Sequence, residues 1–267
     1  MIINFGILNL SPDSFSDGED FDLDFFYNKA QTLINNGFDV IDVGAESTRP
    51  GASIISPKEE WARLKDFLLR YNLSKPLSLD SFKPETIKNA LYYNSSISYI
   101  NDVTGLHNPD LVYQVAEHAE SFVKLIAMHS KGGVPPGLRA SEIPDEFYDE
   151  DGGLKENLLV FFHESIKTCK KFQIDSSRLI LDLGLGFGKN LKHSFELLDL
   201  IPEIKKEFGL PVMIGASRKN FLRLWKSSPN AQWAELDSWT KEYNSLGIRA
   251  GAEYLRSHSN PISAKIA

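Results

Sequence analysis

Eight short runs rich in β-branched and aliphatic residues recur along the whole chain, and longer amphipathic stretches separate them. Strands joined by helices form parallel sheets, because two parallel neighbours need a crossover connection between them. Eight parallel strands close a (β/α)8 TIM barrel, whose usual size is about 250 residues. The sequence therefore predicts an α/β barrel, with a doubly wound open sheet as the alternative. The predicted strands cover residues 2–9, 38–44, 76–81, 98–103, 122–129, 178–183, 211–216 and 252–257.

The amphipathic stretches between these runs carry helix start and stop signals. Ser56 is expected to cap the helix that follows it, with Pro57 at the first helical position and Glu59 three residues after the cap. Gly37 follows another stretch and suits its C-terminal cap, since glycine adopts a left-handed conformation without strain. The clearest predicted helices cover residues 22–36, 56–71 and 154–172.

Neither a composition break, a glycine- and serine-rich linker nor an internal repeat divides the chain, so we predict a single barrel domain over residues 1–267. Two segments depart from the regular alternation. Residues 130–153 are rich in glycine and proline and acidic at their end, which predicts a mobile loop. Only "SNPISAKIA" follows the eighth predicted strand. We therefore expect the last covering helix of the barrel to be short or missing.

The composition narrows the classes of protein that the chain can represent. Of its 267 residues, 42% are hydrophobic and 24% are charged, which is ordinary for a globular protein with a full core. No apolar run approaches the roughly 18 residues of a membrane span, and the N-terminus lacks the basic start of a signal peptide. A single cysteine, Cys169, excludes an intrachain disulfide framework and fits a reducing, cytoplasmic location.

The charge balance bears on the partners of the chain. A net charge of −7 argues against a general nucleic-acid-binding surface, which is usually basic. It still allows a small anionic substrate, provided that a few cations converge locally. We therefore expect small-molecule substrates, with neither a nucleic acid nor a membrane as a partner.

Unusual polar motifs follow the ends of the predicted strands, whereas the connections from helices into strands are bland. The first three strands lead into "NLSPDSFSDG", "DVGAESTRPGA" and "SLDSFK". The later strands lead into "INDVTG", "AMH", "LDLGLGFGK", "GASRK" and "RSH". In a parallel barrel all strand C-termini lie on one face. We therefore predict that these eight motifs surround one catalytic or binding mouth.

The cationic residues of these motifs suit a phosphate or diphosphate group. They are Arg49, Lys219, Arg256 and His258. Asn9 offers an amide oxygen at the end of the first strand, where a hard divalent cation can sit beside phosphate oxygens. The pattern therefore predicts a site for an anionic group together with a metal ion.

Asp80, Asn101 and Asp182 add acceptors and donors at three other strand ends. Such a set suits a flat heterocycle that presents ring N–H, amino and carbonyl groups side by side. Each aspartate taken alone has another interpretation, because a strand-end Asp often caps the next helix. His129 also ends a strand, and it is either a site residue or the partner of a backbone group. "GLGFGK" fails both common nucleotide-loop patterns, so we discount it as an isolated motif.

Seven motifs occur in an order and spacing that resemble the dihydropteroate synthases, the folate-pathway enzymes of the pterin-binding barrel family. They are "GILNLSPDSFSDG", "GAESTRPGA", "SLDSFK", "INDVTG", "LDLGLGFGK", "GASRK" and "GAEYLRSH". The resemblance implies a transferase that condenses 6-hydroxymethyl-7,8-dihydropterin diphosphate with p-aminobenzoate, giving 7,8-dihydropteroate and diphosphate with the assistance of Mg²⁺. It also implies that diphosphate leaves first, through a cationic pterin methylene.

The resemblance assigns roles to residues of these motifs. Catalytic roles are implied for Asp80, Lys219, Arg256 and His258. Pterin binding is implied for Asp80, Asn101, Met128, Asp182, Gly215 and Lys219. Diphosphate binding is implied for Asn9, Arg49, Arg256 and His258, with Asn9 as the Mg²⁺ ligand. Binding of p-aminobenzoate is implied for Thr48, Pro50, Phe187 and Ser217. A homodimer, competition by sulfonamides and closure of the first two loops over the substrate are further implications.

Four positions depart from the family pattern. Leu183 stands in place of a proline, Ala45 in place of a glycine and Ser11 in place of a threonine. Ser259 replaces the aspartate that follows the family's histidine, so the support of His258 has to come from elsewhere. These departures motivate one alternative function, a non-catalytic pterin-binding relative. A second alternative is a methyltetrahydrofolate:corrinoid methyltransferase, which shares the pterin-recognising barrel.

The diphosphate clamp weighs against both alternatives. Pterin binding alone does not require such a clamp, yet the chain retains Asn9, Lys219, Arg256 and His258. The "SPDSFSDG" and "SRK" motifs weigh against methyl transfer, because that reaction involves no diphosphate. The resemblance therefore favours an active dihydropteroate synthase.

Overall fold

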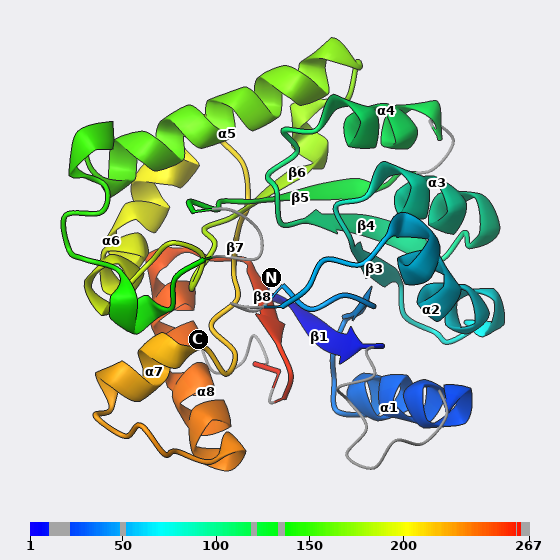
Figure 1. Ribbon diagram of the computed structural model, residues 1–267, viewed down its shortest axis with the longest axis horizontal. Helices are drawn as coiled ribbons and strands as arrows, with labels where there is room; N and C mark the ends of the chain where they lie inside the picture. The colour runs from blue at the N-terminus through cyan, green and yellow to red at the C-terminus, as the bar shows by residue number, and fades with distance from the viewer. Residues whose placement is uncertain (11–21, 49–51, 119–121, 133–136, 260, 263–267) are drawn as a thin grey trace.

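Eight parallel strands close into a barrel in the order β1 to β8, and helices surround it (Figure 1). The structure is a computed structural model that describes residues 1–10, 22–48, 52–118, 122–132, 137–259 and 261–262. β1 pairs with β8, and that pairing completes the closure. The predicted barrel is confirmed, and the open sheet is excluded. The strands are β1 (Ile3–Asn9), β2 (Val40–Gly44), β3 (Leu77–Asp80), β4 (Ile97–Asp102), β5 (Lys124–Met128), β6 (Leu179–Asp182), β7 (Val212–Ile214) and β8 (Tyr254–Ser257).

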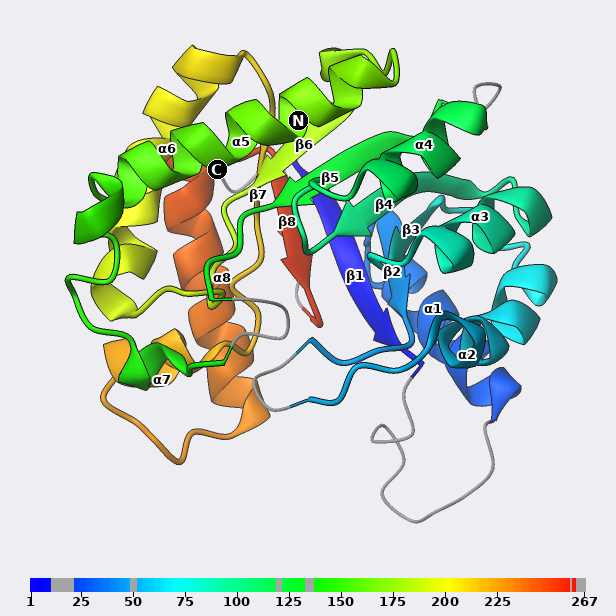
Figure 2. The ribbon, with the colours of Figure 1, turned by 45° about the horizontal axis from the view of Figure 1, so that its top comes forward.

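Helices connect consecutive strands and cover the outside of the barrel (Figure 2). The three helices predicted from the sequence are α1, α2 and α5, each within one residue of its predicted bounds. The Ser56 side chain accepts the Glu59 backbone N–H at 3.2 Å, as its predicted capping role requires. Two helices, α7 and α8, lie between β7 and β8. The helices are α1 (Leu23–Asn35), α2 (Pro57–Arg70), α3 (Pro84–Tyr93), α4 (Pro109–Glu117), α5 (Leu154–Lys171), α6 (Leu191–Phe208), α7 (Asn220–Trp225) and α8 (Trp233–Ala250).

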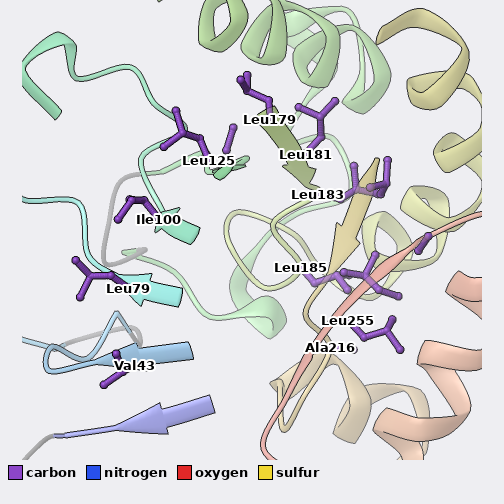
Figure 3. Packing of buried hydrophobic residues seen from close by; sticks show 14 of the residues in the cluster. Val43, Leu79, Ile100, Leu125, Leu179, Leu181, Leu183, Leu185, Ala216 and Leu255 are labelled. Carbon is purple, nitrogen blue, oxygen red and sulfur yellow. The ribbon is translucent and has the colours of Figure 1, made fainter. Parts of the chain in front are cut away.

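Side chains along each strand alternate between the two faces of the barrel wall, as the two-residue period of a strand requires. One set packs with helix residues in the main hydrophobic core, part of which Figure 3 shows. Leu79, Leu181 and Leu255 belong to this set and are almost completely buried. The residues beside them in sequence, among them Asp80 and Arg256, therefore face the barrel interior.

The interior set forms an apolar floor with a polar layer above it. The floor is one buried cluster of residues from six strands: Phe5, Val40, Ile126, Ile180, Met213 and Tyr254. Asp42, Asp182 and Arg256 each stand two positions beyond a member of this cluster on the same strand. They therefore share its face but lie nearer the strand C-termini, where barrel enzymes carry their active sites.

The segment 130–153 is not the mobile loop predicted from its glycines and prolines, because most of it is folded. Its described part includes two short 3-10 helices, η2 (Ala140–Glu142) and η3 (Asp149–Asp151). Tyr148 is almost completely buried, and its hydroxyl donates to the Gly188 carbonyl oxygen at 2.8 Å. Burial of this ring offsets the entropy cost of ordering the chain around it.

The chain that follows β8 bears on the predicted lack of a last covering helix. Residues 260 and 263–267 lie outside the described ones, so this stays a prediction. Ile262 is described, and its backbone N–H donates to Asn4 Oδ1 at 3.0 Å while Asn4 Nδ2 donates back to its carbonyl at 3.1 Å. These two bonds fasten the chain after β8 to the start of β1.

The single cysteine is a core residue. Cys169 is completely buried within α5, and burial raises the pKa of its thiol to about 12. Such a thiol is unreactive at neutral pH, because the nucleophilic species is the thiolate. Within the described part of the chain, no helix combines the length and the apolar character that crossing a membrane requires.

Candidate active site

Arg256 is held between two carboxylates at the mouth of the barrel. Its Nε donates to Asp42 Oδ2 on β2, and its Nη2 donates to Asp80 Oδ2 on β3, both at 2.6 Å. The Asp42 side chain is completely buried, and only 20% of the Arg256 side chain is exposed. Two charge-assisted bonds from one planar guanidinium fix its orientation. β2 and β3 therefore set the direction in which Arg256 points.

Asp80 also meets a second predicted site residue. Asp80 and Asn101 are directly opposite in the β3–β4 register, and Asn101 Nδ2 donates to Asp80 Oδ1 at 3.4 Å. Burial raises the pKa of Asp80 to about 7, and the nearby Arg256 acts in the opposite direction. The positive charge at 2.6 Å favours the carboxylate form. Asp80 is thus a largely buried carboxyl group with two fixed partners, and the charge of Arg256 favours its ionised form.

Strands β6 and β7 bring a second charged pair to the mouth. Asp182 accepts the Gly184 N–H through Oδ1 at 2.8 Å, and Lys219 Nζ donates to the Leu185 carbonyl oxygen. Burial lowers the pKa of Lys219 to about 8, while the negative charge of Asp182 acts to raise it. Burial also raises the pKa of Asp182, and Lys219 acts to lower it. Each charge therefore offsets part of the burial cost of the other.

The two charged pairs face the same interior. A Cβ placed on Gly215 would lie 3.7 Å from Arg256 Cβ and 4.0 Å from Asp182 Oδ2, so the end of β7 lies between these side chains. Arg256 also lowers the pKa of both Asp182 and Lys219 by its charge. The four predicted residues at this mouth, which come from the ends of β3, β6, β7 and β8, are Asp80, Asp182, Lys219 and Arg256.

An apolar cluster stands beside these charges. Met128 and Phe187, both expected to contact a substrate, pack with Val103, and the half-buried Phe82 packs against the group. Lys219 Nζ lies 5.1 Å from the centre of the Phe187 ring, within the range of a cation–π contact. An apolar wall with a few converging polar groups is the usual form of a small-molecule site.

Ser217 and His258 join the ends of β7 and β8. Ser217 Oγ lies 2.9 Å from His258 Nδ1 and accepts the His258 backbone N–H at 3.1 Å. Next to Ser217, Arg218 forms a two-point ion pair with Asp237 of α8, at 2.8 and 2.9 Å. The Ser259 side chain hydrogen-bonds the same Asp237. α8 therefore supports the residues on both sides of the Ser217–His258 contact.

Comparison of the chain with known proteins identifies the family to which it belongs. The profile of the family described as pterin binding enzyme matches residues 5–258. The chain is 33% identical to the dihydropteroate synthase of Bacillus subtilis over 266 residues, which cover 98% of this chain and 85% of the relative. The chain belongs to the dihydropteroate synthase family.

Two solved structures of dihydropteroate synthases resemble this barrel over nearly its whole length. That of Clostridium difficile, in the presence of pteroic acid, gives a TM-score of 0.84 at 29% identity and covers 97% of this chain and 91% of its own. That of Anaplasma phagocytophilum, with bound 6-hydroxymethylpterin-monophosphate, gives a TM-score of 0.81 at 34% identity and covers 97% and 94%. The agreement confirms the family resemblance seen in the motifs.

The structure does not test the roles of four residues that the dihydropteroate synthase motifs imply. Arg49 and Pro50 lie outside the described residues. Thr48 is half-buried shortly after β2, and Asn9 ends β1 opposite Gly44 in the register. The roles of these four residues stay predictions.

The motifs assign one protein oxygen, that of Asn9, to a magnesium ion. In the described part of the chain, no group of three or more His, Cys, Asp or Glu side chains is placed to hold a metal ion. Mg²⁺, however, is often bound by one or two protein oxygens, with phosphate oxygens and waters supplying the rest. The half-buried Asn9, at the C-terminal end of β1, fits an ion that a diphosphate largely holds.

His129, whose role the sequence left open, is a structural residue. It is completely buried, with Nε2 2.8 Å from Asn157 Oδ1 and Nδ1 2.8 Å from Lys189 Nζ. Lys189 also donates to the Phe187 carbonyl oxygen at 3.0 Å. Burial lowers the pKa of both His129 and Lys189. The lysine of "GFGK" therefore supports the loop that carries Phe187, consistent with discounting the motif as a phosphate cradle.

Asp42 is a site residue to which the motifs assigned no role, although it begins "DVGAESTRPGA". It holds Arg256 as firmly as Asp80 does, yet it lies within β2 instead of at its end. Its signal in the sequence is a lone carboxylate inside the apolar run "VIDVG". A charge at a buried strand position needs a partner, so this pattern predicts a cation nearby, although it does not say which one.

Gly184 permits the turn after Asp182, and its replacement by alanine is expected to destabilise the barrel strongly. Its φ is 66°, and an added Cβ would lie 1.7 Å from the His129 carbonyl oxygen. A left-handed φ alone costs about 1–2 kcal/mol, and the clash should raise the total loss above about 3 kcal/mol. Gly209 is the matched control, with a φ of 64° but no atom within 4 Å of an added Cβ. Urea unfolding that shows equal losses for both variants would refute the role of the contact.

Proposed function

We propose that the chain is an active dihydropteroate synthase, a transferase of folate biosynthesis. It would join 6-hydroxymethyl-7,8-dihydropterin diphosphate to p-aminobenzoate. The bond between the pterin methylene and the diphosphate oxygen breaks, and a bond from that carbon to the amine nitrogen forms with loss of one proton. The products are 7,8-dihydropteroate and diphosphate. The observation that carries the proposal is the meeting of Asp80, Asp182, Lys219 and Arg256 at one mouth.

The pterin ring would lie along the apolar cluster that contains Met128. The Asp182 carboxylate can accept bonds from the amino group and the adjacent ring N–H of a pterin. Lys219 and Asn101 can donate to its carbonyl oxygen and ring nitrogens. Gly215 has no side chain to occupy the space beside Asp182 and Arg256, which leaves room for a flat ring.

The diphosphate would meet Arg256. Carboxylates engage Nε and one N–H of Nη2, which leaves Nη1 and the second N–H of Nη2 as donors for phosphate oxygens. His258, supported through Nδ1 by Ser217, and Arg49 would add further donors. Mg²⁺ held at Asn9 would, when bound, neutralise charge that develops on the leaving diphosphate.

Departure of diphosphate before amine attack separates a positive pterin methylene from a negative leaving group. Asp80 would stabilise the positive partner, because a fixed carboxylate acts more strongly in a buried site than in water. Arg256 and Asn101 already hold Asp80, so little reorganisation is needed at the moment of reaction. Arg256 would then contact the catalytic carboxylate and the leaving group with different N–H groups of one guanidinium.

The p-aminobenzoate site would form at the edge of the same mouth. Phe187 would supply an apolar wall, and Thr48 and Pro50 would approach from the connection after β2. Ser217 contacts His258 in this structure. When His258 Nδ1 carries a hydrogen, the two lone pairs of Ser217 Oγ accept from the ring and the backbone of His258, and its proton stays available for a carboxylate.

One assay tests the proposal directly. The protein is incubated with the pterin diphosphate, Mg²⁺ and p-aminobenzoate, and both dihydropteroate and diphosphate are followed. We expect equal amounts of the two products, and we expect sulfonamides to compete with p-aminobenzoate. Tight pterin binding without turnover would favour the non-catalytic relative. Turnover that ignores saturating sulfonamide would show that the second pocket is misassigned.

Lys219 gives this activity a predicted dependence on pH. Its pKa is lowered to about 8 by burial, so the ammonium predominates below that pH and the neutral amine above it. If the ammonium binds the pterin, kcat/KM should fall as pH rises through 8, by about tenfold for each further pH unit. Lys219→Arg should remove this falling limb, because a guanidinium stays charged there. A profile that stays flat to pH 9.5 in the parent protein would refute the assignment.

The proposal has two further parts, the oligomeric state and the location. A homodimer is implied by the family resemblance. A cytoplasmic location is favoured by the single reduced cysteine, Cys169, and by substrates that belong to intracellular metabolism.

A further inference from the structure

A buried triad of charges lies beside the mouth, outside the residues to which the proposed mechanism assigns roles. Lys83 Nζ lies 2.9 Å from Glu46 Oε2 and 3.7 Å from Glu60 Oε2. The three side chains are only 7%, 4% and 1% exposed. Burying charges is costly unless they are paired. We therefore expect this triad, with its net charge of −1, to have a structural role.

The triad joins two crossover connections of the barrel, the one from β2 to β3 and the one from β3 to β4. Glu46 follows β2, Lys83 follows β3 at the start of α3, and Glu60 belongs to α2. Ser81 strengthens the link, since its hydroxyl donates to Glu60 Oε2 at 3.0 Å and accepts the Lys83 backbone N–H at 3.3 Å. Removal of Lys83 would therefore leave the buried carboxylates of Glu46 and Glu60 without their cation.

Glu46 also closes the connection after β2 on itself. Its Oε1 accepts the Ile55 backbone N–H at 2.6 Å. One carboxylate thus holds the beginning of the connection, where Thr48 lies, to its end just before α2. Lys83 fixes the other oxygen of the same carboxylate, so the lysine sets the position of this clasp relative to β3.

Lys83 reaches the mouth through its neighbour in sequence. Its Nζ lies 5.1 Å from the centre of the Phe82 ring. Phe82 packs against the apolar cluster of Val103, Met128 and Phe187. The triad is therefore one side chain away from the wall of the proposed substrate site.

We propose that Lys83 is a positioning residue for the p-aminobenzoate site. It holds the Glu46–Ile55 clasp against the end of β3, and so fixes Thr48, two residues after Glu46, relative to Phe82 of the apolar wall. This inference rests on the proposed function for its kinetic consequence. The clasp itself is a property of the chain that can be measured without turnover.

Lys83→Met is the test variant, and Lys88→Met is its control, since Lys88 lies on the same helix but is exposed. At saturating pterin diphosphate, Lys83→Met should raise the KM for p-aminobenzoate at least tenfold, which corresponds to about 1.4 kcal/mol. The Kd for pterin diphosphate should stay within twofold, because Lys83 pairs with Glu46 and Glu60, neither of which is assigned to the pterin. Lys83→Arg should recover most of the loss, since it keeps the charge.

Amide hydrogen exchange supplies the readout that does not depend on catalysis. Lys83→Met should speed exchange at the Ile55 amide about tenfold, and Lys88→Met should leave it unchanged. Unchanged exchange at the Ile55 amide in Lys83→Met would show that Lys83 does not hold the clasp. Faster exchange with an unchanged KM, or an equal rise in KM and Kd, would overturn the positioning role. Absence of turnover in the parent protein would instead refute the proposed function, and exchange would still decide on the clasp.

A second variant keeps the test valid if Lys83→Met does not fold. Lys83→Met combined with Glu60→Gln removes one positive and one negative charge, so the triad keeps its net charge of −1. This variant lacks the ion pair between Lys83 and Glu46, but the Glu46 carboxylate no longer lies near a second carboxylate. It should fold and still show faster exchange at Ile55 and a raised KM. Parent-like values for both would refute the proposal.

Discussion

Replacement of Asp80 by asparagine is expected to lower kcat at least about a hundredfold while the barrel stays folded. Asparagine has the shape of aspartate; its oxygen can accept from Arg256, and its NH2 can donate to Asn101 once that amide turns over, but it carries no negative charge. Loss of one preorganised electrostatic group at a developing charge typically costs about 10²–10³ in kcat. The binding of pterin diphosphate should change much less, because the ground-state pterin carries no cationic methylene.

Three measurements separate these effects. Single-turnover release of diphosphate reports on the step in which charge separates, equilibrium binding reports on pterin affinity, and circular dichroism reports on the fold. Asp66→Asn is the control, because Asp66 is exposed on α2, away from the mouth. A kcat within threefold of the parent, or an equal loss in kcat and pterin affinity, would remove Asp80 from its proposed role.

Much of the fold was predictable because its signals are local. Each strand is a short apolar run, and each predicted strand range overlaps an observed strand. Ser56 and Pro57 marked the start of α2 because capping depends only on neighbouring residues. The barrel followed from counting strands, since eight parallel strands with helical crossovers have few other arrangements.

The sequence predicted which residues meet in the candidate site, but it did not predict which of them form ion pairs or hydrogen bonds with each other. The period of two along a strand places Asp182 and Arg256 in the interior, and the parallel order places both at one mouth. The sequence does not say that Arg256 bridges Asp42 and Asp80, because that choice depends on distances across the barrel. Ser217 illustrates the same limit, since its contact with His258 joins two strand ends.

The folded part of 130–153 shows where composition misleads. Its glycines and prolines are typical of a loop, and the segment does lack long helices or strands. Its order comes from single buried contacts. The Tyr148 hydroxyl reaches Gly188, and Asn190 Nδ2 donates to the Ile143 carbonyl oxygen at 3.1 Å. Such contacts join positions about 40 residues or more apart in the chain, so no local pattern contains them.

Arg256 contributes both to the stability of the fold and to the proposed transferase activity, so its replacement should reduce both. Arg256→Met leaves the buried carboxylates of Asp42 and Asp80 without their cation, which should cost about 3–5 kcal/mol of unfolding free energy. The same variant should show no measurable turnover, because the diphosphate loses its main donor and Asp80 loses its orientation. Arg249→Met, at an exposed position near the end of α8, should leave both quantities unchanged.

Two further variants separate the structural loss from the chemical one. Asp42→Asn combined with Arg256→Met removes one of the stranded charges, so urea unfolding should show part of the stability restored, whereas turnover should remain absent. Arg256→Lys keeps a positive charge but replaces the planar fork by a single ammonium, which cannot bond both carboxylates and a phosphate with the same geometry. It should fold nearly as stably as the parent and still release diphosphate at least tenfold more slowly. Parent-like release from Arg256→Lys would mean that charge alone suffices, and that the pairing with Asp42 and Asp80 serves the fold only.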